Sequence, residues 1–127
     1  MKIISSKIHG VLDYLVGVIL IISPWLLNFA TGGPEMWIPI ILGISTLIYS
    51  VITRYELGVL KIISFKTHLM IDALSGIFLA ASPWLFGFAD KVYLPHLLFG
   101  LLELIVVSLT HTSTTANYKN ATHPRVV

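Results

Sequence analysis

The stretch KIHGVLDYLVG at residues 7–17 returns as KTHLMIDALSG at residues 66–76, and this repetition predicts the architecture of the chain. In both copies a histidine, an aspartate and a glycine follow one another at intervals of four residues within an apolar run. Further along, SPWL at residues 23–26 returns as SPWL at residues 82–85. Each pair is separated by 59 residues without a gap, as from Lys7 to Lys66. The chain is therefore an internal duplication, and each copy is expected to form one structural unit.

Apolar residues dominate the chain and occur in long runs. Of the 127 residues, 56% are hydrophobic and 11% are charged, whereas a soluble domain carries about a quarter charged residues. Runs of about 18 to 22 apolar residues are long enough to cross a hydrocarbon core of ~30 Å as helices. The runs lack the alternating pattern of a membrane barrel, so helices are the remaining way to satisfy the backbone in lipid. The predicted spans are residues 8–29, 36–53, 69–86 and 92–109.

Two spans in each copy predict an all-α fold, an integral membrane four-helix bundle built from two helical hairpins. Because each copy has an even number of crossings, both copies enter the membrane in the same direction, which makes the hairpins a parallel repeat. The amphipathic composition between the copies favours a short helix lying in the membrane interface. The predicted segments are a first two-helix repeat (1–53), an interfacial connector (54–65), a second two-helix repeat (66–111) and a flexible tail (112–127).

Basic residues are concentrated on one side of the predicted topology. Lys91 is the single basic residue expected on the other side. The basic residues outside the spans on the richer side are Lys2, Lys7, Arg54, Lys61, Lys66, Lys119 and Arg125. The positive-inside rule then puts both termini and the connector in the cytoplasm and the bundle in the plasma (inner) membrane. The net charge of +2 is read as a topology signal and does not indicate a nucleic-acid partner.

The two copies resemble the SPW-repeat family of small bacterial membrane proteins. The resemblance rests on the doubled His-x3-Asp-x3-Gly helix that ends in Ser-Pro-Trp, and it covers about residues 7–110. It implies a membrane location and a repeated two-helix unit, and it implies no activity. The motif residues are assigned an architectural role: Gly17, Ser23, Pro24, Trp25, Gly76, Ser82, Pro83 and Trp84.

We expect each motif proline to kink its helix near the outer end. The serine before it is expected to partner the freed backbone groups, and the tryptophan after it to lie at the headgroups.

Ionisable side chains stand inside the predicted membrane spans. In each copy the histidine and the aspartate are four residues apart, so both lie on one face of a helix. Glu103 in the last span falls at a similar depth. An ionisable group at the centre of a membrane helix costs at least about 2.5 kcal/mol, so such groups face inward and find partners. The predicted intramembrane polar cluster is His9, Asp13, His68, Asp72 and Glu103.

Three interpretations of this cluster stay open. In the leading one its hydrogen bonds pin the helices together, and the protein is a non-enzymatic structural or accessory membrane component that binds no cofactor. The second is a proton or ion path that runs from His96 through Glu103 to the aspartates. The third is a cofactor site, either a haem held by the two histidines or a metal ion. The candidate metal ligands are His9, Asp13, His68 and Asp72.

The residues and motifs that the sequence lacks exclude several classes of chemistry. It contains no cysteine, which excludes thiol redox reactions and thiolate-bound metals. It also contains no phosphate-binding loop and no nucleophile motif, so enzymatic activity is not predicted. The expected partners are the lipid bilayer and, because so small a bundle buries little surface, further copies of the chain or the subunits of a larger membrane complex.

Overall fold

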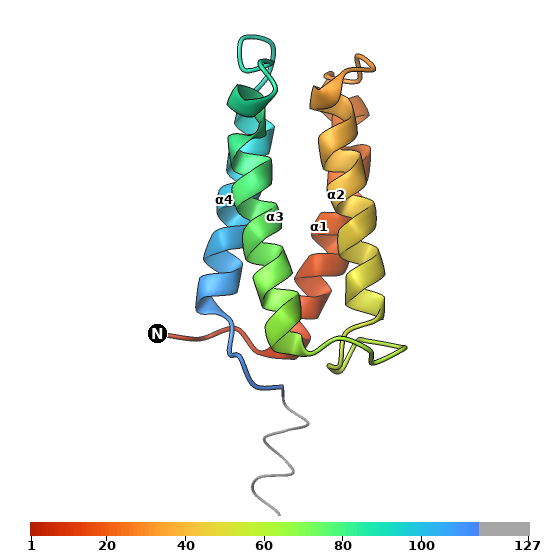
Figure 1. The fold of residues 1–127 in the computed structure, drawn as a ribbon, viewed down its shortest axis with the longest axis vertical. Helices are drawn as coiled ribbons and strands as arrows, with labels where there is room; N and C mark the ends of the chain where they lie inside the picture. The colour runs from red at the N-terminus through yellow and green to blue at the C-terminus, as the bar shows by residue number, and fades with distance from the viewer. Residues whose placement is uncertain (115–127) are drawn as a thin grey trace, which may run out of the picture.

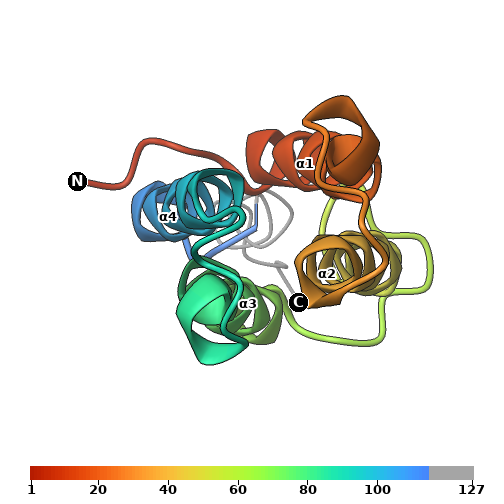
Figure 2. The ribbon, with the colours of Figure 1, turned by 90° about the horizontal axis from the view of Figure 1, so that it is seen from above.

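The computed structural model describes residues 1–114, which form four helices and contain no strand (Figure 1). α1 (Ser6–Leu26) and α2 (Pro34–Val51) form one hairpin, and α3 (Phe65–Leu85) and α4 (Leu94–Leu109) form the second. Seen along the bundle, the hairpins lie side by side with α2 next to α3 (Figure 2). The predicted all-α four-helix bundle is confirmed. Most of the predicted tail, residues 115–127, lies outside the described residues.

The two ends of the bundle differ. One end, here called the Trp end, carries both Ser-Pro-Trp motifs and the loops at residues 27–33 and 86–93. The opposite end, here called the connector end, carries the N-terminal segment, the connector and residues 110–114 (Figure 1).

The helices expose apolar side chains and bury polar ones. The exposed side chains of α1 are large and recur every three or four residues: Ile8, Val11, Leu15, Val18 and Ile22. The opposite face of α1 buries His9, Asp13 and Ser23. A soluble bundle turns its polar face to the solvent, whereas lipid favours polar groups inside. Three helices, α1 to α3, are long and apolar enough to cross a membrane. The chain is therefore an integral membrane protein.

The fourth helix is shorter than the sequence predicts. α4 has 16 residues, which corresponds to roughly 24 Å of helical rise. It begins at Leu94, and Val92 and Tyr93 lie in the preceding loop. Pro95 then occupies the first turn, where its missing N–H costs no helical hydrogen bond.

The third helix begins earlier than predicted, inside the segment that was assigned to the connector. The hydroxyl of Ser64 accepts a hydrogen bond from the amide of Thr67 at 3.1 Å and caps α3. Ser5 caps α1 in the same way, with the amide of Ile8 at 3.3 Å. A serine cap satisfies an amide that has no partner within the helix, so both helices begin at equivalent positions of the repeat.

The connector does not form the interfacial helix that its composition favours. Instead its backbone folds back over the end of α2. The amide of Val59 donates to the carbonyl of Val51 at 2.7 Å, and the amide of Ile62 donates to that of Ile52, also at 2.7 Å. Carbonyls at the end of a helix have no helical partner, and the connector supplies their donors. The prediction of a helix was wrong because these tertiary hydrogen bonds hold the connector backbone in another conformation, which its amphipathic composition does not reveal.

Within each hairpin the helices cross where two glycines face each other. A Cβ on Gly43 of α2 would stand 2.6 Å from the carbonyl oxygen of Gly17 on α1. A Cβ on Gly100 of α4 would stand 2.5 Å from the carbonyl oxygen of Gly76 on α3. Neither site leaves room for a side chain, so the glycines allow the two backbones to approach closely.

Candidate functional site

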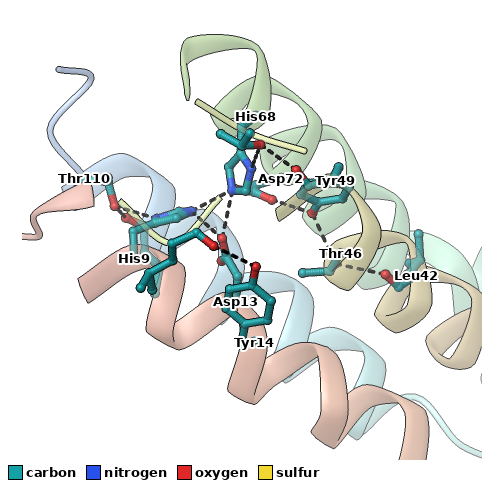
Figure 3. Close-up of polar contacts among 12 residues, drawn as sticks. His9, Asp13, Tyr14, Leu42, Thr46, Tyr49, His68, Asp72 and Thr110 are labelled. Atoms are coloured by element: carbon teal, nitrogen blue, oxygen red, sulfur yellow. Dashed lines mark hydrogen bonds and ion pairs between the residues drawn. The ribbon is translucent and has the colours of Figure 1, made fainter. Parts of the chain in front are cut away.

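Four ionisable side chains meet between the two hairpins, near the connector end (Figure 3). His9 and Asp13 come from α1, and His68 and Asp72 come from α3. Nε2 of His9 lies 2.9 Å from Oδ2 of Asp72. Nε2 of His68 lies 2.8 Å from Oδ2 of Asp13. We call these four residues the His/Asp quartet, and its shortest contacts join one hairpin to the other.

Each histidine also lies close to the aspartate of its own helix. The distance from Nε2 to Oδ2 is 3.3 Å on α1 and 3.1 Å on α3. Residues four positions apart lie one above the other on a helix face, so both members of each pair reach the same point. The quartet is buried: the two histidines are 0% exposed, Asp72 is 1% exposed and Asp13 is 8% exposed.

A threonine holds the far side of each imidazole ring. Nδ1 of His9 lies 2.9 Å from Oγ1 of Thr110, the residue that follows α4. Nδ1 of His68 lies 2.8 Å from Oγ1 of Thr53, two residues after α2. Each threonine hydroxyl also donates to the backbone carbonyl four residues earlier, at 2.6 Å for Thr110 and 2.5 Å for Thr53.

These bonds fix the position of one hydrogen on each ring. A hydroxyl has a single hydrogen, and each threonine gives it to a backbone carbonyl. The hydroxyl must therefore accept from the imidazole, so Nδ1–H donates in both histidines. The Nε2 atom then faces carboxylate oxygens at 2.8–2.9 Å. Two facing lone pairs would repel, so a proton or another cation must stand between nitrogen and oxygen.

The two halves of the quartet are not equivalent. The hydroxyl of Tyr49 on α2 donates to Oδ1 of Asp72 at 2.5 Å. The second helices of the repeats match at an offset of 57 residues, as from Gly43 to Gly100, and this offset puts Val106 at the position of Tyr49. Within residues 1–114 no tyrosine hydroxyl is bonded to Asp13 in this way, and the site departs from the symmetry of the repeat.

Glu103, the fifth member of the predicted cluster, borders the quartet without bonding to it. A cavity of about 20 Å³ lies beside Glu103, and its polar lining also includes His9, Asp13 and Thr46. This volume suits about one water molecule. No hydrogen bond or ion pair joins Glu103 to the quartet within residues 1–114. The structure thus brings together four of the five predicted residues and sets the fifth across a small cavity.

Aromatic rings cover the quartet toward the connector end. The ring of Phe65 lies 5.6 Å from the rings of both His9 and His68. The ring of Tyr55 stacks on Phe65 at 5.6 Å and packs against Gly10, where a Cβ would overlap it. Burial raises the pKa of the Tyr55 phenol, so this side chain stays neutral. These rings separate the quartet from the end of the bundle.

His96, the predicted outer start of a proton path, lies apart from the quartet at the Trp end. Its Nε2–H donates to the backbone carbonyl of Glu35 at 2.9 Å. Its ring packs against Phe29 at 5.2 Å and Phe88 at 5.0 Å. Along the helices, an apolar core separates the two regions: Leu20, Ile38, Leu79 and Phe88. Within the part of the chain that the structure describes, the predicted proton path is therefore interrupted by apolar side chains.

Sequence reasoning missed the partners of the quartet. No role was predicted for Tyr49, Thr53 or Thr110. A signal was present, because Thr53 and Thr110 are separated by 57 residues, the same offset as Gly43 and Gly100. Both threonines stand at helix ends, however, and their distance from the histidines depends on how the chain leaves each helix.

Comparison with known proteins identifies the repeat. The model of the SPW repeat domain matches residues 7–110. The chain belongs to the SPW-repeat family. A search of the curated proteins found no match, and a search of the solved structures found none.

The serine and proline of the SPW repeat form one local unit. Pro24 has no N–H, so the carbonyl of Leu20, four residues earlier, loses its helical partner. Oγ of Ser23 donates to this carbonyl at 2.9 Å. In the second SPW repeat, Oγ of Ser82 donates to the carbonyl of Leu79 at 2.8 Å. The prediction that the serines partner the freed backbone groups is confirmed.

Each SPW repeat then turns through a residue of left-handed conformation. Asn28 has a φ of 60° and Gly87, its equivalent, has a φ of 70°; asparagine and glycine tolerate this region best. The turn directs Phe29 and Phe88 into the bundle, where they are 5% and 2% exposed. The tryptophans stay about half exposed at this end, as residues of an aromatic belt do: Trp25, Trp37 and Trp84.

Proposed function

We propose that this SPW-repeat protein is a non-enzymatic membrane component whose His/Asp quartet fastens its two hairpins into one bundle. The observation that supports the proposal is the direction of the shortest hydrogen bonds. His9 on α1 pairs with Asp72 on α3, and His68 on α3 pairs with Asp13 on α1. Because each repeat supplies one histidine and one aspartate, the duplication makes a single motif complementary to its own copy.

The free-energy cost of unpaired buried charges favours a role of the quartet in specifying how the two hairpins associate. Hydrogen bonds between membrane helices contribute about 0.6 kcal/mol on average, but breaking a buried ion pair by removing one partner costs roughly 3–5 kcal/mol. All four side chains are satisfied only when each histidine is level with the aspartate of the other hairpin. A sliding of one hairpin along the other would leave buried charges unpaired, so the quartet selects one register.

Backbone hydrogen bonds at the connector end also join the two hairpins. The amides of Ile3 and Ile4 donate to the carbonyl of Leu109 at 2.8 and 2.9 Å, and the amide of His111 donates to the carbonyl of Ile4 at 2.9 Å. The N-terminal segment is thereby joined to the end of α4. These bonds support a bundle that is closed at the level of the quartet.

The space around the quartet supports a non-enzymatic role. The cavity that borders it has a volume of about 20 Å³, whereas small-molecule sites span roughly 300–1,000 Å³. An accessory role fits this geometry, with the apolar outer surface available to lipid, to further copies of the chain or to other membrane subunits. Ion conduction has less support, because the apolar core lies between His96 and the quartet.

A double-mutant cycle between His9 and Asp72 tests the proposal. We expect His9→Ala and Asp72→Ala each to lower the free energy of unfolding of the metal-free protein in detergent. Because the side chains touch, we expect their coupling to be roughly 0.5–3 kcal/mol. His9→Ala combined with His96→Ala is the matched control, since these histidines lie in separate regions and their effects should add to within about 0.5 kcal/mol.

Two outcomes decide the matter. Coupling between His9 and Asp72 that exceeds the control supports the fastening role. Additive effects, together with unchanged stability of both single variants, would contradict the fastening role. If an alanine variant does not fold, the cycle is measured with His9→Gln and Asp72→Asn, which preserve side-chain volume.

A further inference from the structure

We propose that the His/Asp quartet is a binding site for one divalent transition-metal ion, with Zn²⁺ as the best-fitting ion. Its ligands are the two Nε2 atoms of His9 and His68 and one Oδ2 atom each of Asp13 and Asp72. This inference goes beyond the fastening role, which requires only that the four side chains attract one another.

The ligand atoms already converge on one point. All four lie within 4.8 Å of one another, and the four nitrogen-to-oxygen distances are 2.8–3.3 Å. Tetrahedral Zn²⁺ with bonds of 2.0–2.2 Å has ligands roughly 3.3–3.6 Å apart. The shorter nitrogen-to-oxygen pairs would therefore have to separate by about 0.5 Å or more to admit the ion, a movement that rotation of the side chains can supply.

The imidazole rings have the orientation and the tautomer that a metal site requires. Metal-binding histidines donate their second ring N–H to an oxygen, which fixes the ring and raises its basicity. Here the Nδ1–H groups donate to Thr110 and Thr53. The threonines cannot act as donors to the rings, because their hydrogens go to backbone carbonyls. Both Nε2 lone pairs thus point to the centre of the quartet.

The charges are also suited to a divalent ion. Two buried carboxylates carry two negative charges, and buried charges need compensation. One divalent cation neutralises both and at the same time removes the repulsion between the Nε2 and Oδ2 lone pairs. Two protons held on the histidines would provide the same total charge, so the experiment must separate these two occupants.

The donor set selects the class of ion. Two imidazoles and two carboxylates suit Zn²⁺ and neighbouring first-row metals, whereas Ca²⁺ and Mg²⁺ prefer six or more oxygen ligands. A haem, the other cofactor considered, is much larger than the cavity of about 20 Å³ beside the quartet. The rings of His9 and His68 are also 5.4 Å apart at 70°, and axial haem ligands must face each other across the macrocycle.

Metal analysis and titration of the full-length protein test the proposal. The protein is purified in mild detergent, without a histidine tag, and its metal content is measured by mass spectrometry. It is then stripped with a chelator and titrated with ZnCl₂ by calorimetry. We expect one equivalent of Zn²⁺ to bind the wild type and the His96→Gln control, and to be lost in His9→Gln and in Asp13→Asn.

Substitution of the threonines tests the metal site separately from the fastening role, because it changes the Zn²⁺ affinity only if the quartet binds the ion. We expect the double variant Thr53→Val, Thr110→Val to keep one site but to bind Zn²⁺ about 10–100-fold more weakly, because the rings lose their orienting partner. Substitution of both threonines with serine retains the hydroxyls and should restore the affinity.

The titration of the wild type decides the proposal even if a variant fails to fold. Absence of stoichiometric Zn²⁺ binding, with Nε2–H signals of protonated His9 and His68 in nuclear magnetic resonance spectra, would overturn it and assign two protons to the quartet. The fastening role would survive that result, because its double-mutant cycle uses metal-free protein. Conversely, one tight Zn²⁺ site without coupling in the metal-free cycle would support the metal site alone.

Discussion

Single residues of this chain show how lipid changes the cost of a backbone defect. A helix that contains a proline leaves one carbonyl without a partner, and water repairs this defect in a soluble protein. Inside a bilayer the repair must come from the protein itself. Ser23 and Ser82 supply it, each through one hydroxyl bonded to a carbonyl at 2.8–2.9 Å.

We therefore expect Ser23→Ala and Ser82→Ala each to lower the free energy of unfolding by about 1–3 kcal/mol, the cost of an unsatisfied buried acceptor. Unfolding in mixed detergent micelles, followed by circular dichroism, measures the change. Ser108→Ala is the matched control. Its hydroxyl also donates to a carbonyl three residues earlier, at 2.8 Å, but no proline follows, so the helix provides a second partner. An equally large loss in Ser108→Ala would contradict the explanation.

Within each hairpin, the two helices pack closely at one point because glycines there leave no side chain between the backbones. In lipid the hydrophobic effect does not drive helices together, and close packing of backbones replaces it. Gly43 and Gly100 mark this point in the two hairpins, and each faces a glycine of the neighbouring helix. The same hairpin geometry therefore occurs twice, and it sets the position of each helix face that carries the quartet.

Gly43→Ala and Gly100→Ala test this role. We expect each to reduce the free energy of unfolding by about 1–3 kcal/mol, because the added Cβ would push the helices apart. The neighbouring lipid-facing residues are the controls, since Ile44 is 46% and Leu101 is 44% exposed. Ile44→Ala and Leu101→Ala should have a smaller effect in the same unfolding measurement. Glycine variants as stable as these controls would show that the backbones do not need the close approach.

At the scale of the whole molecule, most basic side chains within residues 1–114 lie at one end of the bundle. Lys2, Lys7, Arg54 and Lys61 belong to the connector end, together with the start of α3, and Lys91 belongs to the Trp end. Positive charges near membrane helices stay on the cytoplasmic side. The charge distribution thus predicts that the connector end faces the cytoplasm, independently of the quartet.

Reporter fusions test the predicted orientation in a bacterial cell. Green fluorescent protein fused after Val127 should fluoresce, because it folds in the cytoplasm. Alkaline phosphatase inserted after Gly32, in the loop of the Trp end, should be active because that loop is exported, and the same insertion after Gly58 in the connector should be inactive. The reversed pattern would show that the bundle has the opposite orientation.

The duplication, the four apolar helices and the inward position of the histidines and aspartates could be predicted from the amino-acid sequence alone. These properties are local or periodic: a helix is the only open structure that satisfies its backbone in lipid, and an ionisable residue on an apolar helix must face inward. The serines before the prolines were likewise predictable, because the carbonyl they serve lies within the same helix turn. The fixed offset of 59 residues then related one repeat to the other.

Which side chains meet could not be predicted from the sequence, because it depends on the packing of the helices and the path of the loops. The connector folds over α2, and Thr53 and Thr110 reach the two histidines, because of how the chain leaves two helix ends. Glu103 remains outside the quartet because α4 presents it to a cavity between helices. Such contacts depend on helix rotation and loop path to within about an ångström, and the period of a helix in the sequence does not fix either.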